Sequence, residues 1–314
     1  GKAVGAFGPG RHTLKTANIP LLTKIASLPW GLNSPLRAEV YFVNLKVFTN
    51  LKWGTRDPVA FKDSELGLIR LRAFGVFNLQ VVQPNQQGGQ KLTQFGYPGN
   101  YNDDLLQTWV GIGSQIDGLG QLGEAGYYYN CNDEKEISAI TGLTKLGVHD
   151  IPPLVGRAVI LDMAKHAGKT YLEAGEHFGE AEVKAAAEAQ GVTIGEGDIV
   201  LFHTGWTENM LEAEPTAWVS GEPGINVSGS RYLASLGVMA VGADTWGIEP
   251  VPPAPGDGAF YGHVVLLKEN GIYILETMNT GPVLRDGVNE FMFVLGQARI
   301  RGTVQMIINP VALY

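Results

Sequence analysis

The side chains best placed to do chemistry gather in one glycine-rich stretch, residues 103–121. Gln115, Asp117 and Gln121 stand there at i, i+2 and i+6, with glycines between them. In an extended segment these even spacings place all three side chains on one face. Glycine also lets the backbone turn tightly or approach a ligand closely. The alternative is a loop in which Asp117 caps a helix or closes a turn, because Gly and Asp are common turn residues.

Other candidates follow short apolar runs later in the chain. His203 ends one such run, and Asp244 and Glu249 flank Trp246 after another. In α/β proteins, ligands bind at the carboxyl ends of the strands, so these positions could line a pocket. A hydrogen-bonded structural role is the open alternative for His203, since buried polar groups are normally paired. The single thiol, Cys131, has no adjacent base and is predicted to be inert.

The elements that would carry these residues alternate between strands and helices. Buried strands are expected at residues 157–162, 198–203, 238–244 and 272–276. Helices are expected at residues 179–190, which Gly191 would end, and at residues 228–237 and 263–271. Two long strands are expected at residues 288–300 and 303–313. This alternation indicates an α/β fold.

Charge divides the chain into two parts. Residues 1–84 carry a net charge of +7 and residues 85–314 a net charge of −15, and a polar Gly/Pro/Gln linker lies at residues 82–90. We therefore predict a β-rich segment over residues 1–84 and a second domain over residues 85–314. In the first part, a turn is expected at residues 8–14, and strands at 40–49 and 69–80.

Composition excludes several classes of protein. The formal net charge of −8 and the pI of about 5.3 argue against nucleic-acid binding through a basic face. No apolar run reaches the roughly 18 residues that span a membrane. One cysteine permits no internal disulfide, which fits a reducing compartment, and we expect a cytoplasmic protein. No signal peptide is visible, although the chain opens on Gly1 rather than Met.

The stretch around Asp117 resembles the metal-binding signature of the cyclase family, which includes bacterial kynurenine formamidase and isatin hydrolase. That signature reads His-x-Gly-Thr-His-x-Asp-x-x-x-His. Gly113, Ser114 and Asp117 match its frame, whereas Gly111, Gln115 and Gln121 replace the three histidines. Further matches include Thr204-Gly-Trp206, Gly221-Glu-Pro-Gly224 and Val241-Gly-Ala-Asp244, so the resemblance covers nearly all of residues 85–314.

The resemblance implies a fold and a metal site. The fold would be the swivelling β/β/α fold of the family. The second metal-binding segment would contain His263 and Glu276, so the implied ligands are Asp117, His263 and Glu276. These suit one divalent Mn or Zn ion, and Gln115 could add an amide oxygen. Gln121 stands where the family has its acid/base histidine. Gln cannot titrate, so the chain lacks the proton transfer that this histidine would supply. General acid–base catalysis is typically worth a rate increase of roughly 10²–10⁴-fold.

Residues 1–84 resemble part of a band-7 (SPFH-like) domain of the bacterial type. The sequence segments that carry this resemblance are Gly8-Pro-Gly-Arg-His-Thr-Leu, Asn18-Ile-Pro-Leu-Leu, Ala38-Glu-Val-Tyr-Phe-Val-Asn, Lys52-Trp-Gly-Thr and Arg72-Ala-Phe-Gly. Such domains are membrane-associated scaffolds that oligomerise. We therefore interpret the chain as a band-7-like fragment joined to an N-terminally shortened cyclase-like domain.

Together these features predict a metal-dependent hydrolase of the arylformamidase/cyclase type, whose catalysis the replacement of the signature histidines could impair. Its substrate would be a small amide, lactam, lactone or N-formyl aryl amine. Gln121 and Gln115 would take part in catalysis, and Trp109, His203 and Trp246 would line the substrate pocket. The family resemblance implies a homodimer or homotetramer. The alternative, favoured by the missing histidines, is a catalytically silent binding or scaffold protein of the same fold.

Overall fold

The computed structural model describes residues 108–314 throughout. Before them it describes the backbone of residues 48–54, 59–63, 67–79, 90–91 and 100–101, and residue 96. The chain divides into two compact units, residues 1–47 with 80–107, and residues 48–79 with 108–314. The turn expected at residues 8–14 and most of the strand expected at 40–49 lie outside the described residues. The candidate site lies in the second unit.

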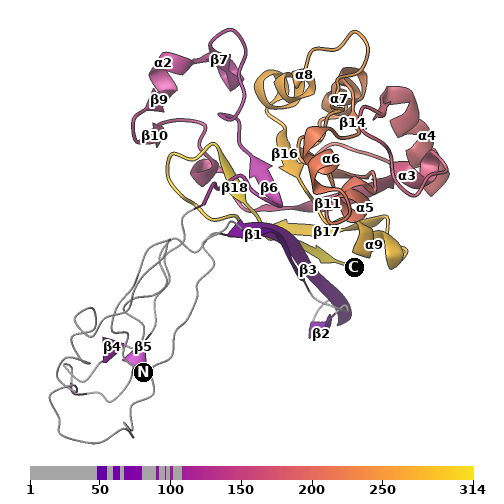
Figure 1. Ribbon diagram of the computed structural model, residues 1–314, viewed down its shortest axis with the longest axis horizontal. Helices are drawn as coiled ribbons and strands as arrows, with labels where there is room; N and C mark the ends of the chain where they lie inside the picture. The colour runs from indigo at the N-terminus through magenta and orange to yellow at the C-terminus, as the bar shows by residue number, and fades with distance from the viewer. Residues whose placement is uncertain are drawn as a thin grey trace, which may run out of the picture. The chain divides into compact units, whose positions relative to one another are not determined.

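An eleven-stranded sheet forms the centre of the second unit (Figure 1). Its spatial order is β1-β3-β19-β17-β11-β13-β15-β16-β6-β18, and β2 pairs with β3. The bounds of these strands are β1 (Phe48–Gly54), β2 (Val59–Asp63), β3 (Gly67–Leu79), β6 (Gln115–Asp117), β11 (Leu154–Asp162), β13 (Ile199–His203), β15 (Ala240–Ala243), β16 (Tyr273–Glu276), β17 (Glu290–Leu295), β18 (Gln305–Ile307) and β19 (Val311–Leu313).

The middle of the sheet is parallel. Strands β11, β13, β15 and β16 run in one direction, and antiparallel strands continue the sheet on both sides. Parallel strands are normally buried on both faces, which explains the continuous apolar runs that predicted them. On one face, Val159 and Phe202 pack with the helices, and on the other, Ile160 and Leu201 form a second core. The predicted α/β class is confirmed.

Helices cover the two faces unequally (Figure 1). The first core includes residues of α4, α7 and the π-helix η5, whereas the second includes Val283 of α9. The predicted helix at 179–190 is α4, and Gly191 ends it with a φ of +69°. The helix bounds are α2 (Glu134–Ile137), α3 (Met163–His166), α4 (Glu180–Gln190), α5 (Trp206–Met210), α6 (Pro215–Ser220), α7 (Val227–Ser235), α8 (Tyr261–His263), η5 (Val264–Glu269) and α9 (Gly281–Arg285).

Short elements complete the described fold. Four two-stranded pairings stand apart from the main sheet: β4 (Gln90–Lys91) with β5 (Asn100–Tyr101), β7 (Tyr127–Tyr128) with β8 (Asn132–Asp133), β9 (Ser138–Ala139) with β10 (Gly142–Leu143), and β12 (His177–Phe178) with β14 (Gly224–Ile225). Two 3₁₀ helices are η3 (Tyr129–Cys131) and η4 (Val148–Asp150). Among the described helices, none is both long enough and apolar enough to cross a membrane.

Two segments differ from the sequence expectation. Residues 303–313 form two strands, β18 on β6 and β19 on β17, instead of one. Pro310 lies between them, and proline cannot donate a hydrogen bond within a strand. The extended stretch expected around Asp117 is limited to β6. The chain turns after it, where the Gln121 N–H donates to the carbonyl of Gly118 at 3.0 Å, so Gln121 leaves the face that β6 presents.

Strands from the predicted N-terminal segment join the main sheet. β3 pairs antiparallel with β19, with residue 73 opposite Val311 and residue 71 opposite Leu313. β1 and β2 then pair with β3, so all three strands belong to the second compact unit. The expected strand at 69–80 is β3. The expected division of the chain at residues 84 and 85 stays a prediction.

Candidate metal centre

Three buried side chains converge at one end of the parallel strands. One ligand-type atom from each of Asp117, His263 and Glu276 lies within 4.8 Å of the others. His263 Nε2 is 3.3 Å from Glu276 Oε1 and 3.9 Å from Asp117 Oδ2. All three residues are at most 4% exposed. The structure thus brings together the three residues expected to be metal ligands, although they lie far apart in the sequence.

Strand register brings the two carboxylates together. In the antiparallel pair β6–β16, Gln115 faces Glu276 and Asp117 faces Ile274. Residues 115 and 117 therefore share a face with residues 274 and 276, because side chains alternate along a strand. Ile274 belongs to the helix-covered core, which places the carboxylates on that face of the sheet. The Gln115 Nε2 amide donates a hydrogen bond to Glu276 Oε2.

A third acid, Glu249, holds His263 on the side of the ring opposite Nε2. The His263 Nδ1 lies 2.6 Å from Glu249 Oε1, and the His263 backbone N–H donates to the same oxygen at 2.7 Å. The Gly262 N–H donates to Glu249 Oε2 at 2.8 Å. A Cβ at Gly262 would lie 2.7 Å from the Glu249 carboxyl carbon, so this approach needs glycine. Glu249 therefore holds the ring with Nε2 directed at the two acids.

The local helix geometry also helps to position His263. His263 ends α8 and leads directly into the π-helix η5, whose residues 264–267 are buried. π-helical turns are rare and occur frequently at functional sites. The Phe260 ring packs edge-on against the imidazole, with ring centroids 5.5 Å apart. Phe260 thus gives the imidazole an apolar neighbour beside its contacts to the acids.

Burial and the neighbouring charges shift the pKa values of the residues in this cluster. Desolvation, followed by the negative charge of Glu276, raises the pKa of Asp117 well above its ordinary value, although His263 opposes the shift. Burial would lower the pKa of His263, but its hydrogen bonds to Glu249 and Glu276 outweigh that effect and raise it to about 10. The cluster therefore gathers carboxylates that are costly to ionise together without a cation.

The donor set fits a divalent metal ion. Neither carboxylate oxygen of Asp117 accepts a hydrogen bond from the described residues, although both are buried. Buried polar atoms are otherwise nearly always satisfied, so a missing electropositive partner explains them best. Two carboxylates and one imidazole are ligands that Zn and Mn accept. The residues present thus fit one divalent ion.

Gln305 lies against Gly111, the residue at the first histidine position of the family signature. A Cβ built at Gly111 would lie 1.9 Å from the Gln305 side-chain nitrogen. Gln305 stands on β18 opposite Asp117 of β6, on the same face of the sheet. The amide of Gln305 therefore occupies the space that a side chain at position 111 would enter, next to the metal centre.

The remaining predicted site residues lie in different surroundings. Gln121 is half-buried, and its Oε1 is buried without a hydrogen bond from the described residues. Trp109 is 84% exposed. Trp246 packs against Phe260 and donates its indole N–H to the Trp218 carbonyl at 3.0 Å. Their roles in catalysis and substrate binding stay predictions.

One acid close to this centre was not singled out from the sequence. Glu222 is fully buried and accepts the Trp246 backbone N–H at 2.6 Å, whereas its Oε1 has no partner among the described residues. Desolvation and the charge of Glu276 raise its pKa well above the ordinary value. In the sequence, Glu222 stands in a Gly-Glu-Pro-Gly turn, where an exposed acid is the usual expectation. Its burial depends on the contact with the loop after β15, where the Trp246 N–H donates to it, and the local sequence does not indicate that contact.

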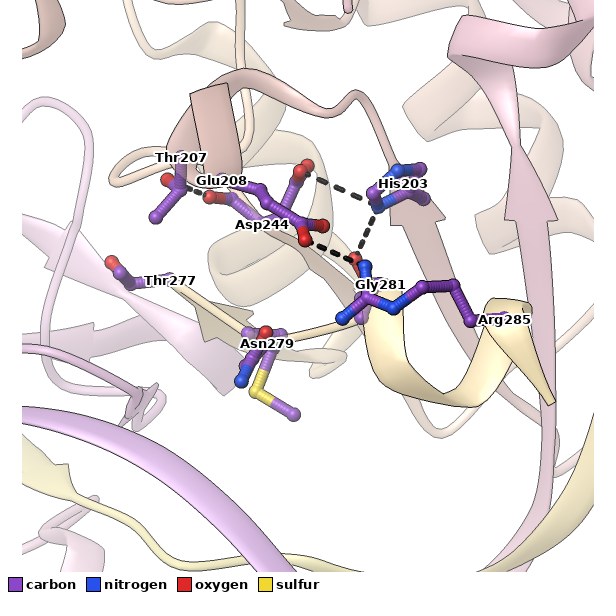
Figure 2. Close-up of a pocket in the computed structure, with 10 residues that line it drawn as sticks. His203, Thr207, Glu208, Asp244, Thr277, Asn279, Gly281 and Arg285 are labelled. Carbon is purple, nitrogen blue, oxygen red and sulfur yellow. Dashed lines mark hydrogen bonds and ion pairs between the residues drawn. The ribbon is translucent and has the colours of Figure 1, made fainter. Parts of the chain in front are cut away.

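His203 lies at a separate cavity of about 140 Å³ (Figure 2). The cavity is lined by the last residue of β13, by residues that follow β15 and β16, and by residues of α5 and α9. These are His203, Thr207, Glu208, Asp244, Thr277, Met278, Asn279, Thr280, Gly281 and Arg285. His203 and Asp244 continue the face of Leu201 and Ala240, which belong to the second core. Glu276 lies on the opposite face with Ile274. The cavity and the metal centre thus use opposite faces of the same strand ends.

Comparison with solved structures identifies the fold. A crystal structure described as a novel cyclase is 22% identical, with a TM-score of 0.63 over 85% of this chain and 86% of that chain. Isatin hydrolase A from Labrenzia aggregata gives 14% identity and a TM-score of 0.51, over 83% and 93% of the two chains. Isatin hydrolase A from Ralstonia solanacearum gives 17% identity and a TM-score of 0.50, over 85% and 91%. The chain has the fold of these cyclases and hydrolases, which confirms the predicted cyclase-like fold.

The N-terminal part matches a different group of proteins. The model of the SPFH domain-Band 7 family matches residues 1–104. The uncharacterized protein YdjI from Bacillus subtilis (strain 168) is 36% identical over 83 residues, which is 26% of this chain and 25% of that protein. The chain thus spans only about a quarter of the length of this curated relative. The predicted resemblance of the N-terminal segment to band-7 domains is confirmed.

Proposed function

We propose that the chain is a metal-assisted hydrolase of a small amide, lactam, lactone or N-formyl aryl amine. The observation that carries this proposal is the convergence of Asp117, His263 and Glu276, with both Asp117 oxygens buried and unpaired, on a cyclase-like fold. The solved structures of similar fold include isatin hydrolases. Their fold and this donor set support hydrolytic chemistry at a carbonyl carbon.

In this proposal Asp117, His263 and Glu276 would hold one Mn or Zn ion. When bound, such an ion lowers the pKa of a coordinated water towards about 7 and polarises a carbonyl oxygen. Glu249 keeps the imidazole Nε2 directed at the site by holding its Nδ1. Gln115 restrains Glu276 through its amide hydrogen bond. Gln121 cannot titrate, so it can orient a polar group but cannot carry a proton.

Metal content tests the proposal first. The purified chain, prepared with and without added Mn²⁺ or Zn²⁺, should hold about one ion per chain after dialysis. Asp117→Ala and Glu276→Ala should lose that ion and any hydrolysis of an acyl-amide, lactam and lactone panel. If both variants keep the metal content and the hydrolysis of the parent chain, the proposed site is wrong.

A silent binding or scaffold protein of the same fold is the second candidate. Two observations favour it: Gln115 and Gln121 replace histidines of the family signature, and residues 1–104 match the Band 7 family. Turnover of the substrate panel with added metal separates the two candidates. Light scattering adds a second criterion, because a scaffold predicts large assemblies, whereas the hydrolase proposal includes a homodimer or homotetramer.

A further inference from the structure

The proposed metal centre leaves room for a further ligand. Asp117, His263 and Glu276 converge there, and all three are buried. A divalent ion such as Mn²⁺ takes about six ligands, and it accepts carbonyl oxygens as well as carboxylates. Three side chains therefore leave coordination positions open for another protein oxygen and for water.

Strand register places Gln305 next to Asp117. In the antiparallel pair β6–β18, Gln305 stands directly opposite Asp117, and on the other side of β6 the same aspartate faces Ile274. The side chains of directly opposite residues rise from the same face, with Cβ atoms about 4.5–5.5 Å apart. The Gln305 side chain thus starts beside the Asp117 carboxylate, on the sheet face that carries the metal centre.

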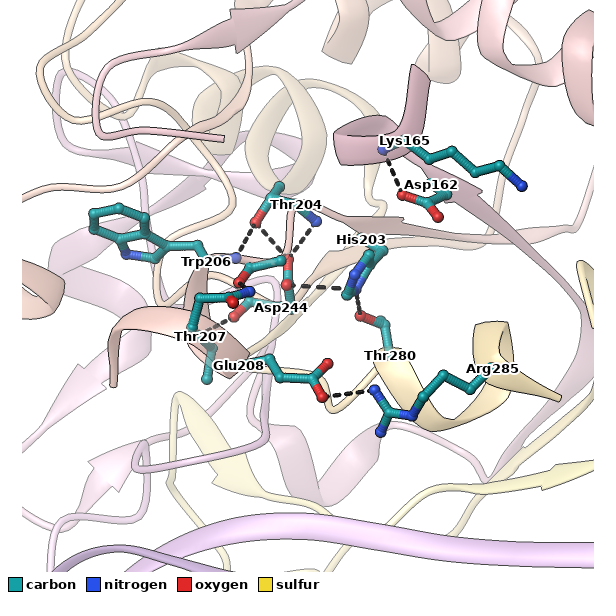
Figure 3. Close-up of polar contacts among 12 residues, drawn as sticks. Asp162, Lys165, His203, Thr204, Trp206, Thr207, Glu208, Asp244, Thr280 and Arg285 are labelled. Atoms are coloured by element: carbon teal, nitrogen blue, oxygen red, sulfur yellow. Dashed lines mark hydrogen bonds and ion pairs between the residues drawn. The ribbon is translucent and has the colours of Figure 1, made fainter. Parts of the chain in front are cut away.

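The Gln305 amide is free, unlike polar groups at the ends of the parallel strands. There the Thr204 hydroxyl donates to Asp244 Oδ1 at 2.7 Å, and His203 Nδ1 lies 2.7 Å from the Thr280 hydroxyl (Figure 3). The Gln305 side chain, by contrast, makes no hydrogen bond and no ion pair with the residues that the structure describes. It is half-buried, on the last strand of the described sheet. Its amide is therefore both accessible and available to a ligand.

Gly111 lets this amide reach its place. A Cβ at position 111 would lie 1.9 Å from Gln305 Nε2, 2.1 Å from its Cδ and 2.7 Å from its Oε1. The whole amide group thus occupies the space in which any larger side chain at position 111 would begin. Position 111 is where the resemblance to the cyclase signature places the first histidine. A side chain from a distant strand therefore fills the place of one from the glycine-rich stretch.

The chemistry of an amide suits this place. Two buried carboxylates already lie at the centre, and a third negative charge would add repulsion before an ion binds. An amide contributes a carbonyl oxygen with two lone pairs and no formal charge. Rotation of the amide group by half a turn exchanges its oxygen and nitrogen, so the oxygen can face the centre without any other change in the chain.

We propose, on the basis of the metal-assisted function proposed above, that Gln305 is a further ligand of the same ion and takes the place of the histidine missing at position 111. Its amide oxygen joins Asp117, His263 and Glu276 as a donor. Positions 111 and 305 then exclude each other as sources of a ligand, because their side chains need the same space.

Competition of Mn²⁺ and Zn²⁺ with a metal-sensitive dye, measured on the full chain, tests this assignment. Gln305→Leu keeps a similar volume but removes the amide, and it should weaken metal binding by at least about tenfold. Asn309→Leu is the matched control, because it removes an exposed amide just beyond β18 and should bind like the parent chain. Circular dichroism establishes that each variant is folded. Equal affinity in folded Gln305→Leu and in the parent chain overturns the assignment.

Asp117→Ala in the same assay separates this assignment from the proposed function. If Asp117→Ala loses the ion and Gln305→Leu keeps it at the parent affinity, the metal site stands and Gln305 is not a ligand. If the parent chain binds neither Mn²⁺ nor Zn²⁺, the proposed function and the role of Gln305 both fail.

A ligand swap distinguishes coordination by Gln305 from a structural role. The backbone at Gly111 does not have a positive φ, so it accepts a histidine. In the parent chain, Gly111→His should not strengthen metal binding, because the Gln305 amide occupies its space. In a Gln305→Gly background, Gly111→His should strengthen binding by at least about tenfold, a coupling that independent sites do not show. If Gly111→His has the same effect in both backgrounds, the assignment of Gln305 to this place is overturned.

Discussion

Glu249 holds His263 through two contacts to a single carboxylate oxygen, the backbone N–H at 2.7 Å and the ring Nδ1 at 2.6 Å. The ring therefore cannot rotate without breaking a charge-assisted hydrogen bond. Partners of this kind typically change metal affinity by about 10–100-fold when they are lost. Glu249 is thus a positioning residue of the candidate metal centre, although it is not among the three converging residues.

Glu249→Gln should weaken divalent metal binding by about 10–100-fold, because a neutral amide holds the imidazole less firmly. Competition with a metal-sensitive dye measures the affinity. Glu269→Gln is the matched control, since Glu269 pairs with Arg231 away from the ligands and should leave the affinity unchanged. Equal affinity in the parent chain and in Glu249→Gln would show that the contact does not position the ligand.

Metal affinity should rise with pH between about 6 and 9. The hydrogen bonds to Glu249 and Glu276 outweigh burial and raise the pKa of His263 to about 10, so the metal-free imidazole is protonated across this range. A metal ligand must be deprotonated, so binding releases that proton, and affinity should increase by about tenfold per pH unit. Titration in buffers of different ionisation enthalpy counts the protons released. An affinity that does not change with pH contradicts this account.

Gln121→His should increase hydrolysis if the proposed reaction is limited by proton transfer. A histidine at this position could supply general acid–base catalysis, which is typically worth roughly 10²–10⁴-fold. The measurement is kcat/KM on the best substrate of the acyl-amide panel with metal added. Gln121→Asn is the control, because it changes the side chain without adding a titrating group. A gain in Gln121→Asn equal to that in Gln121→His would refute the proton-transfer explanation.

Glu222→Gln should stabilise the protein increasingly as the pH rises. Burial, followed by the charge of Glu276, raises the pKa of Glu222 in the folded chain above its unfolded value. The stability contributed by protonated Glu222 is complete below the unfolded pKa and is lost as the pH rises through the folded pKa. Gln still accepts the Trp246 N–H but never ionises.

Thermal unfolding at pH 5 and pH 9 measures this effect. The difference in Tm between Glu222→Gln and the parent chain should be more positive at pH 9. Glu188→Gln, on the exposed side of α4, is the control and should give no such trend. A Tm difference for Glu222→Gln that is the same at both pH values would mean that ionisation of Glu222 does not destabilise the folded chain.

Sequence patterns predicted the parts of the fold that depend on local signals. Helix α4 and strands β11, β13 and β16 follow from composition and periodicity, and Gly191 marked a helix end. The split of residues 303–313 into β18 and β19 was missed because it depends on pairing with two distant partners. Strand register is a long-range property that an apolar run does not specify.

The site was predictable only where a motif covered it. Asp117, His263 and Glu276 were expected together because of a family signature, and the structure brings them together. The anchoring role of Glu249 could not be predicted, because it depends on a loop returning behind the imidazole. Gln305 was missed for a similar reason, since no spacing within its own strand connects it to Gly111.

The pairing of β3 with β19 has a consequence for dividing this protein. The sheet continues from the cyclase-like strands into β1, β2 and β3 without a break in its hydrogen bonds. Removing residues 1–84 would therefore deprive β19 of its outer neighbour β3 and expose a row of unpaired backbone groups, which promotes aggregation. A recombinant fragment of the second compact unit should therefore keep residues 48–79, because β3 completes the sheet at β19.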